Sequence, residues 1–209
     1  MSSISAKKVK ELRDISGAGM MDCKKALTES NGELQKAMDF LRKSGIAKAQ
    51  KKAGREVKDG LITTYIHPGS KLGVMLEINC ETDFVAKTDA FQSLCKDIAM
   101  HIAAAAPVSV SKDEISKSVL SKEREIYAEQ AKASGKPDEI VNKMVEGRMD
   151  KFCKENALLE QQFVKDPNTT VKEVLTDTIA KLGENISIAR FMRFQLGETI
   201  STSNKDNSE

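Results

Sequence analysis

The chain lacks tryptophan altogether, and aromatic residues make up only 4% of its 209 residues. Surfaces that stack nucleic-acid bases depend on aromatic rings, so this scarcity disfavours a binder of single-stranded nucleic acid. A marked excess of positive charge is also missing, because 33 Lys and Arg residues face 31 Asp and Glu residues. Proteins that coat DNA or RNA usually carry a larger positive excess, which makes non-specific nucleic-acid binding the weaker hypothesis.

The sequence has few residues that could form a metal or redox site. Its four cysteines are widely separated, none forms a Cys-x-x-Cys pair, and only two histidines accompany them. We therefore expect no metal and no cofactor. No apolar run reaches membrane-spanning length, and the first five residues show no signal pattern. These features predict a cytoplasmic protein with reduced thiols that needs no membrane, although a disulfide between subunits stays open.

Catalytic motifs are missing as well. The chain contains no Gly-x-x-x-x-Gly-Lys-Ser/Thr phosphate loop, no Gly-x-Ser-x-Gly turn and no His-Glu-x-x-His pair. Gly17-Ala18-Gly19 lacks the preceding strand that a dinucleotide-binding turn needs, and His101 lies in an amphipathic helical pattern that favours a structural role. The sequence favours a binding or regulatory protein over an enzyme.

Residues 1–45 predict a compact unit of three helices. Ser5 can cap the first helix, and Gly17 and Gly19 interrupt the chain before the second. The third helix shows the i, i+3, i+4, i+7 spacing of one buried stripe, formed by Leu34, Ala37, Met38 and Leu41. Gly45 stands where the C-terminal cap of this helix is expected.

Residues 46–60 predict a basic linker that is helical in part. Its positive side chains are Lys48, Lys51, Lys52, Arg55 and Lys58. They could contact RNA or an acidic protein surface, or they could simply keep a connecting segment in water. The second interpretation is favoured, because charge runs commonly have that role.

Residues 61–197 predict an α+β core with a three-stranded antiparallel sheet. Strands are expected at 61–67 and 72–79, joined by a Pro-Gly-Ser turn, and a third is expected at 186–196. A helix capped by Thr88 or Asp89 should end at Pro107, and another should begin after Thr170 and end at Gly183.

Residues 112–156 predict an antiparallel helical hairpin that projects from the core as a coiled-coil arm. Val119 and Ile126 are seven residues apart, as are Leu120 and Tyr127, which suits a helical seam. The reversal is expected at residues 134–137, where Pro137 can begin the return helix. Residues 198–209 form a polar tail for which we expect disorder.

The most informative stretch is residues 77–87, Glu-Ile-Asn-Cys-Glu-Thr-Asp-Phe-Val-Ala-Lys. Val74, Leu76 and Ile78 share one face of a strand, because side chains alternate with period two. Asp83 and Phe84 follow where that strand ends. A charge beside a large apolar ring at an exposed corner suits contact with another protein.

Two stretches carry a resemblance to a known family. Residues 12–27, Leu-Arg-Asp-Ile-Ser-Gly-Ala-Gly-Met-Met-Asp-Cys-Lys-Lys-Ala-Leu, and residues 77–87 resemble the two signature stretches of the elongation factor Ts family. Gly147-Arg148 and residues 183–186 are also similar to it, and the resemblance extends from about Ile4 to Gly197.

The resemblance implies a guanine-nucleotide exchange factor that acts in translation elongation and is not an enzyme. Its partner would be elongation factor Tu, both GDP-bound and nucleotide-free, with no nucleic acid required. It also implies an N-terminal ubiquitin-associated-like domain, a core of antiparallel sheet with helices, and a protruding coiled-coil arm. Long members carry two copies of the core unit, whereas this chain resembles the short form, with one.

The resemblance further implies which residues contact the partner. Phe84 would enter an apolar slot between helices of the GTPase, while Asp83 contacts polar groups beside it and Mg²⁺ coordination at the phosphates is disfavoured. The predicted wedge, a name kept below, comprises Thr82, Asp83, Phe84 and Val85. Predicted contacts elsewhere are Arg13, Met20 and Met21 in the N-terminal domain, together with His67, Leu182 and Gly183.

Each assignment has a structural alternative. Phe84 could be an ordinary core ring and Asp83 a helix cap. The two methionines could fill the small helical core. His67 could be a plain exposed turn residue, and Gly183 could simply cap a helix.

The missing second core copy suggests a homodimer. In long members the wedge and the histidine belong to different copies, whereas here one unit carries both Asp83-Phe84 and His67. We hypothesise that one subunit supplies the wedge while its mate supplies His67 to the same GTPase. An RNA- or ribosome-associated adaptor without exchange activity is the competing hypothesis, and a hydrolase or transferase comes third because no site for it is assembled.

Overall fold

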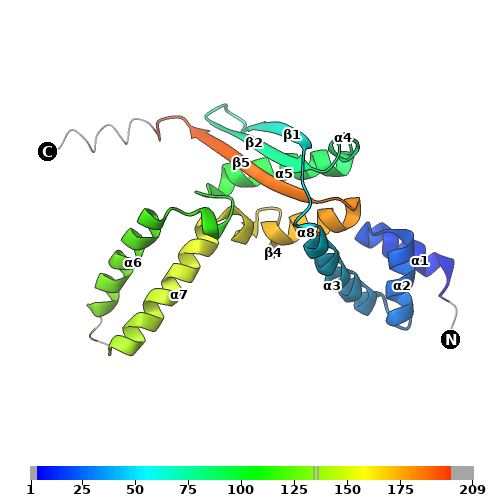
Figure 1. Ribbon diagram of the computed structural model, residues 1–209, viewed down its shortest axis with the longest axis horizontal. Coiled ribbons are helices and arrows are strands. Elements are labelled where there is room, and N and C mark those ends of the chain that lie inside the picture. The colour runs from blue at the N-terminus through cyan, green and yellow to red at the C-terminus, as the bar shows by residue number, and fades with distance from the viewer. Residues whose placement is uncertain (1–3, 134, 136, 199–209) are drawn as a thin grey trace. The chain divides into compact units, whose positions relative to one another are not determined.

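The computed structural model describes residues 4–133, 135 and 137–198 (Figure 1). The chain divides into two compact units. The first unit takes in residues up to 61 together with 78–94 and 173–187, and the second takes in 62–77, 95–172 and the residues from 188 onward. The architecture is α+β, as predicted.

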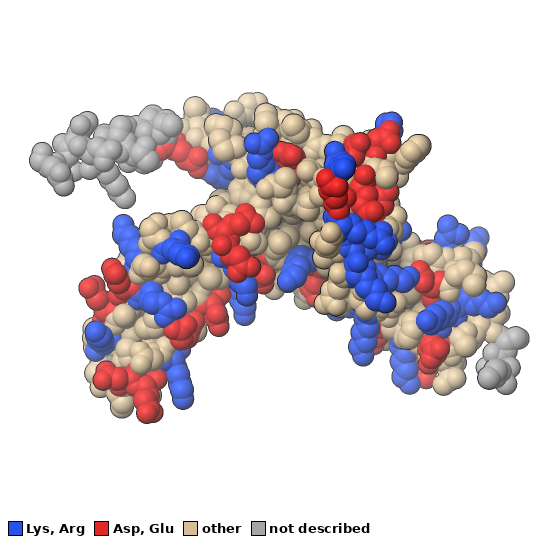
Figure 2. All heavy atoms as spheres, in the orientation of Figure 1, with Lys and Arg blue, Asp and Glu red and all other residues tan. Residues whose placement is uncertain are grey.

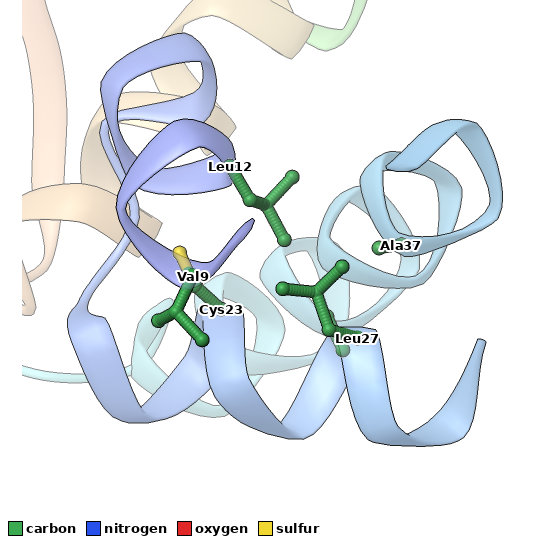
Figure 3. Packing of buried hydrophobic residues seen from close by; sticks show 6 residues of the cluster. Val9, Leu12, Cys23, Leu27 and Ala37 are labelled. Atoms are coloured by element: carbon green, nitrogen blue, oxygen red, sulfur yellow. The ribbon is translucent and has the colours of Figure 1, made fainter. Parts of the chain in front are cut away.

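Three helices open the first unit, and their bounds are α1 Ala6–Ser16, α2 Met20–Glu29 and α3 Leu34–Lys52. They enclose a small apolar core, part of which Figure 3 shows, made of Val9, Leu12, Cys23, Ala26, Leu27 and Ala37. The Ser5 hydroxyl accepts the backbone N–H of Lys8 at 3.3 Å, so the predicted cap of α1 is confirmed. The likeness of these helices to a ubiquitin-associated domain stays a prediction.

The predicted helix end at Gly45 is wrong, because α3 continues to Lys52. A Cβ atom at Gly45 would lie 3.2 Å from the Cβ of Ala180, which belongs to α8, Val171–Leu182. The glycine therefore lets two helices approach each other closely, and it does not end α3. The proposed boundary between residues 45 and 46 stays a prediction.

The main sheet has the order β1-β2-β5 and is antiparallel, as predicted. Its strands are β1 Asp59–Ile66, β2 Leu72–Cys80 and β5 Ile186–Gln195. The backbone N–H of His67 donates to the carbonyl oxygen of Leu72 at 2.9 Å and closes the expected hairpin. A second small sheet pairs β3, Gln162–Phe163, with β4, Asp166–Thr170, and it was not foreseen from the sequence.

Helix α5, Asp89–Ala105, begins and ends where the sequence places it. The Thr88 hydroxyl accepts the backbone N–H of Phe91 at 3.3 Å, so Thr88 is the cap. The C-terminal half of α5 lies beside β5, because Arg193 donates to the carbonyl oxygen of Ala103 at 3.3 Å. The helix stops before Pro107, which cannot donate a helical hydrogen bond.

Helices α6, Lys117–Lys132, and α7, Asp138–Asn156, pack against each other where the sequence predicts the helical hairpin (Figure 1). That this pair forms a projecting coiled-coil arm stays a prediction. Its buried residues are Ala131, Val141, Val145 and Met149, with Leu120 and Tyr127 packed against them. Val119 and Ile126 are 41% and 37% exposed, so only the second predicted pair lies in the seam. The predicted reversal includes residues 134 and 136, which lie outside the described residues.

A buried histidine fastens α5 to the segment that follows α7. His101 is fully buried, and its Nδ1 accepts the backbone N–H of Val164 at 3.2 Å. Its Nε2 therefore carries the hydrogen and donates to Oε1 of Gln161 at 2.9 Å. Gln161 in turn donates to the carbonyl oxygens of Ala105 and Glu155, at 3.4 and 2.7 Å. Burial lowers the pKa of His101, as expected for a neutral structural imidazole.

No two of the four cysteines are joined to each other within the chain; Cys23, Cys80 and Cys95 are buried, and Cys153 in α7 is partly exposed. A disulfide between subunits stays open. Among the helices of the described residues, none combines the length and the apolar character needed to cross a membrane. The predicted polar tail lies outside the described residues from 199 onward.

Candidate partner-binding site

The wedge is built on α4, Asp83–Ala86, a single helical turn between β2 and α5. Strand β2 ends in the fully buried Cys80, and Thr82 then caps α4 by accepting the N–H of Val85 at 3.5 Å. The Thr88 hydroxyl donates to the carbonyl oxygen of Val85 at 2.7 Å. Side-chain caps therefore hold the turn at both ends, which a four-residue helix needs because it has little stability of its own.

The two faces of α4 differ sharply in exposure. Val85 and Ala86 are 8% and 4% exposed, whereas Phe84 is 79% exposed. Successive helical residues are about 100° apart, so the buried pair forces Asp83 and Phe84 to the outer side. The alternative in which Phe84 is a core ring is therefore wrong, and Thr82, not Asp83, is the cap. Val85 anchors the turn from inside, and any role of Val85 toward a partner stays a prediction.

Asp83 is paired with Lys87, the residue that directly follows α4. Its Oδ2 lies 2.6 Å from Nζ of Lys87, one turn further on. This hydrogen bond lowers the pKa of Asp83 and raises that of Lys87. The wedge thus presents an apolar ring next to an ionised carboxylate that is already held in place.

The chain just before α4 is tied to the loop that joins α8 to β5. Glu184 accepts the backbone N–H of Thr82 at 3.0 Å and its hydroxyl at 2.7 Å. Glu81 accepts the backbone N–H of Asn185 at 2.6 Å. Sequence reasoning missed these contacts, since Glu184 and Asn185 stood out there only as part of the family resemblance.

Other predicted contacts of the first unit lie around the turn between α1 and α2. Arg13 is exposed, and Met20 and Met21 are 46% and 76% exposed. The alternative in which the methionines fill the helical core is therefore wrong. Ile15 in α1 is also exposed, at 63%, and was not singled out by the sequence reasoning.

Leu182 and Gly183 lie at the C-terminal end of α8. Gly183 has a φ of +80° and its N–H donates to the carbonyl oxygen of Ile179 at 2.9 Å, so it caps the helix. Its own carbonyl oxygen accepts from Nζ of Lys52. Because Glu184 follows directly, the α8 end and the wedge are connected within the first unit.

Most positive side chains of the predicted basic linker, residues 46–60, are paired with other groups of the chain. Four of its five side chains have partners: Lys48 with Asp22, Lys52 with Gly183, Arg55 with Glu81, and Lys58 with Glu56. Figure 2 shows positive side chains gathered over the C-terminal end of α3 with acidic ones beside them. This pattern fits the solvated connector better than an open RNA-binding stripe.

The second unit holds His67, which is exposed at the end of β1. The hydroxyl of Tyr65 lies 3.1 Å from its Nδ1. Nearby, one face of the sheet carries apolar side chains that are each more than half exposed: Ile62, Ile66, Met75, Met192 and Phe194. These five residues are called the outer sheet face below. A groove of about 420 Å³ lies at this face, lined in part by Ile66, Met75 and Phe194.

Within the part of the chain that the structure describes, no three His, Cys, Asp or Glu side chains gather as metal ligands would. Both units present exposed apolar residues, a pattern typical of proteins that bind other macromolecules. Comparison with known proteins gives the particular family. The family model for elongation factor Ts matches residues 4–198.

Curated relatives agree over nearly the whole length. The chain is 57% identical to an elongation factor Ts of Thermoanaerobacter sp. (strain X514) over 203 residues, 97% of this chain and 100% of the relative. It is 56% identical to one from Geotalea daltonii, covering 98% and 94%, and 56% identical to one from Fervidobacterium nodosum, covering 93% and 99%. The chain belongs to the elongation factor Ts family and thus to the elongation factors of protein synthesis.

Proposed function

We propose that this chain is a guanine-nucleotide exchange factor that binds elongation factor Tu and promotes GDP release during translation elongation. It does so by binding in the cytoplasm, without acting as an enzyme and without a cofactor. Family membership supports the proposal. The observation that carries it is Phe84, which is 79% exposed on a turn whose other side is buried.

The wedge acts on the phosphate end of the nucleotide site. Tight GDP binding depends on backbone donors around the phosphates and on Mg²⁺ that bridges phosphate oxygens and protein ligands. Phe84 enters an apolar slot of the GTPase, Asp83 meets polar groups beside it, and elements around the Mg²⁺ site are displaced. Thr82 and Val85 hold the turn that presents them.

Thermodynamic linkage relates the affinity for GDP to the affinity for the exchange factor. If the factor weakens GDP binding tenfold, which is about 1.4 kcal/mol, then GDP weakens binding of the factor by the same tenfold. The exchange factor therefore binds nucleotide-free elongation factor Tu more tightly than the GDP-bound form.

Further contacts spread the binding energy over the surface. Arg13, Met20 and Met21 form a second contact on the GTPase, and their exposure supports that role. Leu182, Gly183 and His67 add contacts at the end of α8 and at the end of β1.

We also propose that the chain is a homodimer that associates through the outer sheet face. Monomeric proteins rarely leave such contiguous apolar surfaces in water. A self-complementary contact between two copies would cover this face on both at once. The mate then supplies His67 to the GTPase that receives the wedge, a role suggested by the presence of both sites in a single core unit.

The test is the release of labelled GDP from elongation factor Tu. We expect release to accelerate with increasing concentrations of this protein and to reach a plateau. If release does not accelerate while the protein binds RNA in a salt-sensitive manner, the adaptor hypothesis replaces this one. Sedimentation of a fully active protein as a monomer would remove the homodimer.

A further inference from the structure

Two loops of the first unit hold each other through reciprocal contacts between a carboxylate and a backbone N–H. Residues 81–82 precede α4, and residues 184–185 follow α8. Glu184 accepts the N–H and the hydroxyl of Thr82, at 3.0 and 2.7 Å. Glu81 accepts the N–H of Asn185 at 2.6 Å. Hydrogen bonds to an ionised acceptor are about twice as strong as neutral ones, so both loops are firmly held.

A third segment closes this arrangement. The side-chain amide of Asn185, which is 6% exposed, donates to the carbonyl oxygen of Arg55 at 2.8 Å. The Arg55 guanidinium lies 3.5 Å from the carboxylate of Glu81. The residue before Glu184, Gly183, accepts from Lys52. The set Glu81, Thr82, Glu184 and Asn185 is called the clamp below.

The clamp acts on the residue that fixes the direction of α4. A hydroxyl has one hydrogen to donate and can also accept. Glu184 takes the hydrogen of Thr82, which leaves the oxygen to accept the N–H of Val85 as the helix cap. A one-turn helix cannot hold its own direction. Phe84 follows Thr82 by two residues, so the orientation of its ring depends on this cap.

We propose that Glu184 is a positioning residue of the exchange reaction, which orients Phe84 through Thr82 and sets the wedge against the α8 end at Leu182 and Gly183. This inference rests on the proposed function. Glu184 need not touch the partner: it keeps two contact patches of the first unit in fixed relation. Without it, the factor still binds but inserts Phe84 poorly.

The central experiment is Glu184→Gln, which keeps the size of the side chain but replaces one acceptor oxygen with an NH₂ group. The plateau rate of GDP release should fall about tenfold, as for the loss of one hydrogen bond to a charged group. The half-saturating concentration should change less than about threefold, because the other contacts remain. Glu33→Gln is the matched control, since Glu33 pairs with Lys36 on the exposed start of α3. It should leave both quantities unchanged.

A double-mutant cycle separates positioning from a general structural effect. In a Phe84→Ala background there is no ring to orient, so adding Glu184→Gln should not lower the plateau rate further. Additive losses, or a wild-type plateau rate in Glu184→Gln alone, would overturn the proposal. If Glu184→Gln fails to fold, Glu184→Asp, which keeps the charge but shortens the reach, should show the same dependence on Phe84.

Amide hydrogen exchange tests the clamp without the partner. The Thr82 amide should be protected in the wild type and lose protection in Glu184→Ala, which removes both acceptor oxygens, while the Asn185 amide, held by Glu81, stays protected. If the Thr82 amide is equally protected in the wild type and in the variant, the clamp is overturned, even if the protein accelerates GDP release strongly. If the wild type does not accelerate GDP release, both the proposed function and the positioning role are wrong. The protection of the Thr82 amide still shows, independently of GDP release, whether the clamp exists.

Discussion

Phe84 shows how one residue can be costly for a chain in isolation and useful to it in a complex. A ring that is 79% exposed contributes almost nothing to folding, although its burial elsewhere would stabilise the chain. The caps at Thr82 and Thr88 maintain this exposure. The structure thus keeps an apolar side chain exposed at the place where the family resemblance implies the contact with the GTPase.

Phe84→Ala should lower the plateau rate of GDP release about 30-fold, since truncating a central interface aromatic costs about 2 kcal/mol or more. The midpoint of thermal unfolding should stay within about 2 °C, because an exposed ring is removed. Val108→Ala is the control, since Val108 is 60% exposed and belongs to none of the proposed contacts. Wild-type release rates in Phe84→Ala would reject the wedge.

Gly60 gives a second prediction for a single residue. Its φ is +149°, and a Cβ atom there would lie 2.2 Å from the carbonyl oxygen of Ile78 in the neighbouring strand. Backbone cannot move aside as a flexible side chain can, so Gly60→Ala should lower the free energy of unfolding by about 2 kcal/mol or more. Gly54→Ala is the matched control, because a Cβ at Gly54 meets no atom within 4 Å. Denaturant titration of both variants measures the difference.

The elements most open to prediction were those with strong local patterns. In α5, Phe91, Ile98 and Ile102 form one stripe at helical spacing, and all three are fully buried. The predicted end of α3 at Gly45 is too early. The sequence alone does not show that this glycine packs against Ala180, which lies far away along the chain. The pairing of β3 with β4 was missed because a strand of two residues leaves no periodic signal.

The candidate site was also predictable only where the sequence pattern is local. Phe84 could be predicted because an alternating strand ends just before it. The clamp could not be predicted, because 102 residues separate Thr82 from Glu184, and a glutamate in a loop looks like any exposed charge. Only the fold reveals that its carboxylate is directed at a backbone N–H.

The junction between α5 and the segment after α7 should respond to pH through His101. Its pKa is lowered in the folded chain by burial, so between that value and about 6.5 the unfolded chain binds more protons. Stability is therefore fully present above about pH 6.5 and is lost as the pH falls, with a slope of up to about 1.4 kcal/mol per pH unit.

The measurement is the free energy of unfolding between pH 7.5 and 5.5 in wild type and in His101→Gln. The variant should lose the part of the slope that His101 supplies, whereas His67→Gln, which removes the exposed histidine, should keep it. Equal slopes in wild type and His101→Gln would show that the imidazole stays protonated or does not titrate in this range.

At the scale of the whole molecule, the proposed homodimer through the outer sheet face can be tested with a single substitution. Phe194→Glu should shift sedimentation at micromolar concentration from dimer to monomer, because a two-fold contact would bring two copies of the new charge together. Val108→Glu changes a residue of similar exposure, 60% against 62%, outside that face and should leave the dimer intact. A wild-type monomer under these conditions would contradict the proposed association.

The distribution of cysteines has a practical consequence for such measurements. Cys23, Cys80 and Cys95 are buried, and burial raises the pKa of the Cys80 thiol, which keeps it from reacting as a thiolate. Cys153 alone among the four is accessible, and it lies on α7. A maleimide dye should therefore attach to the unaltered chain at one position on the helical hairpin. The natural sequence already provides a single-site fluorescent reporter for following the arrival of a partner in real time.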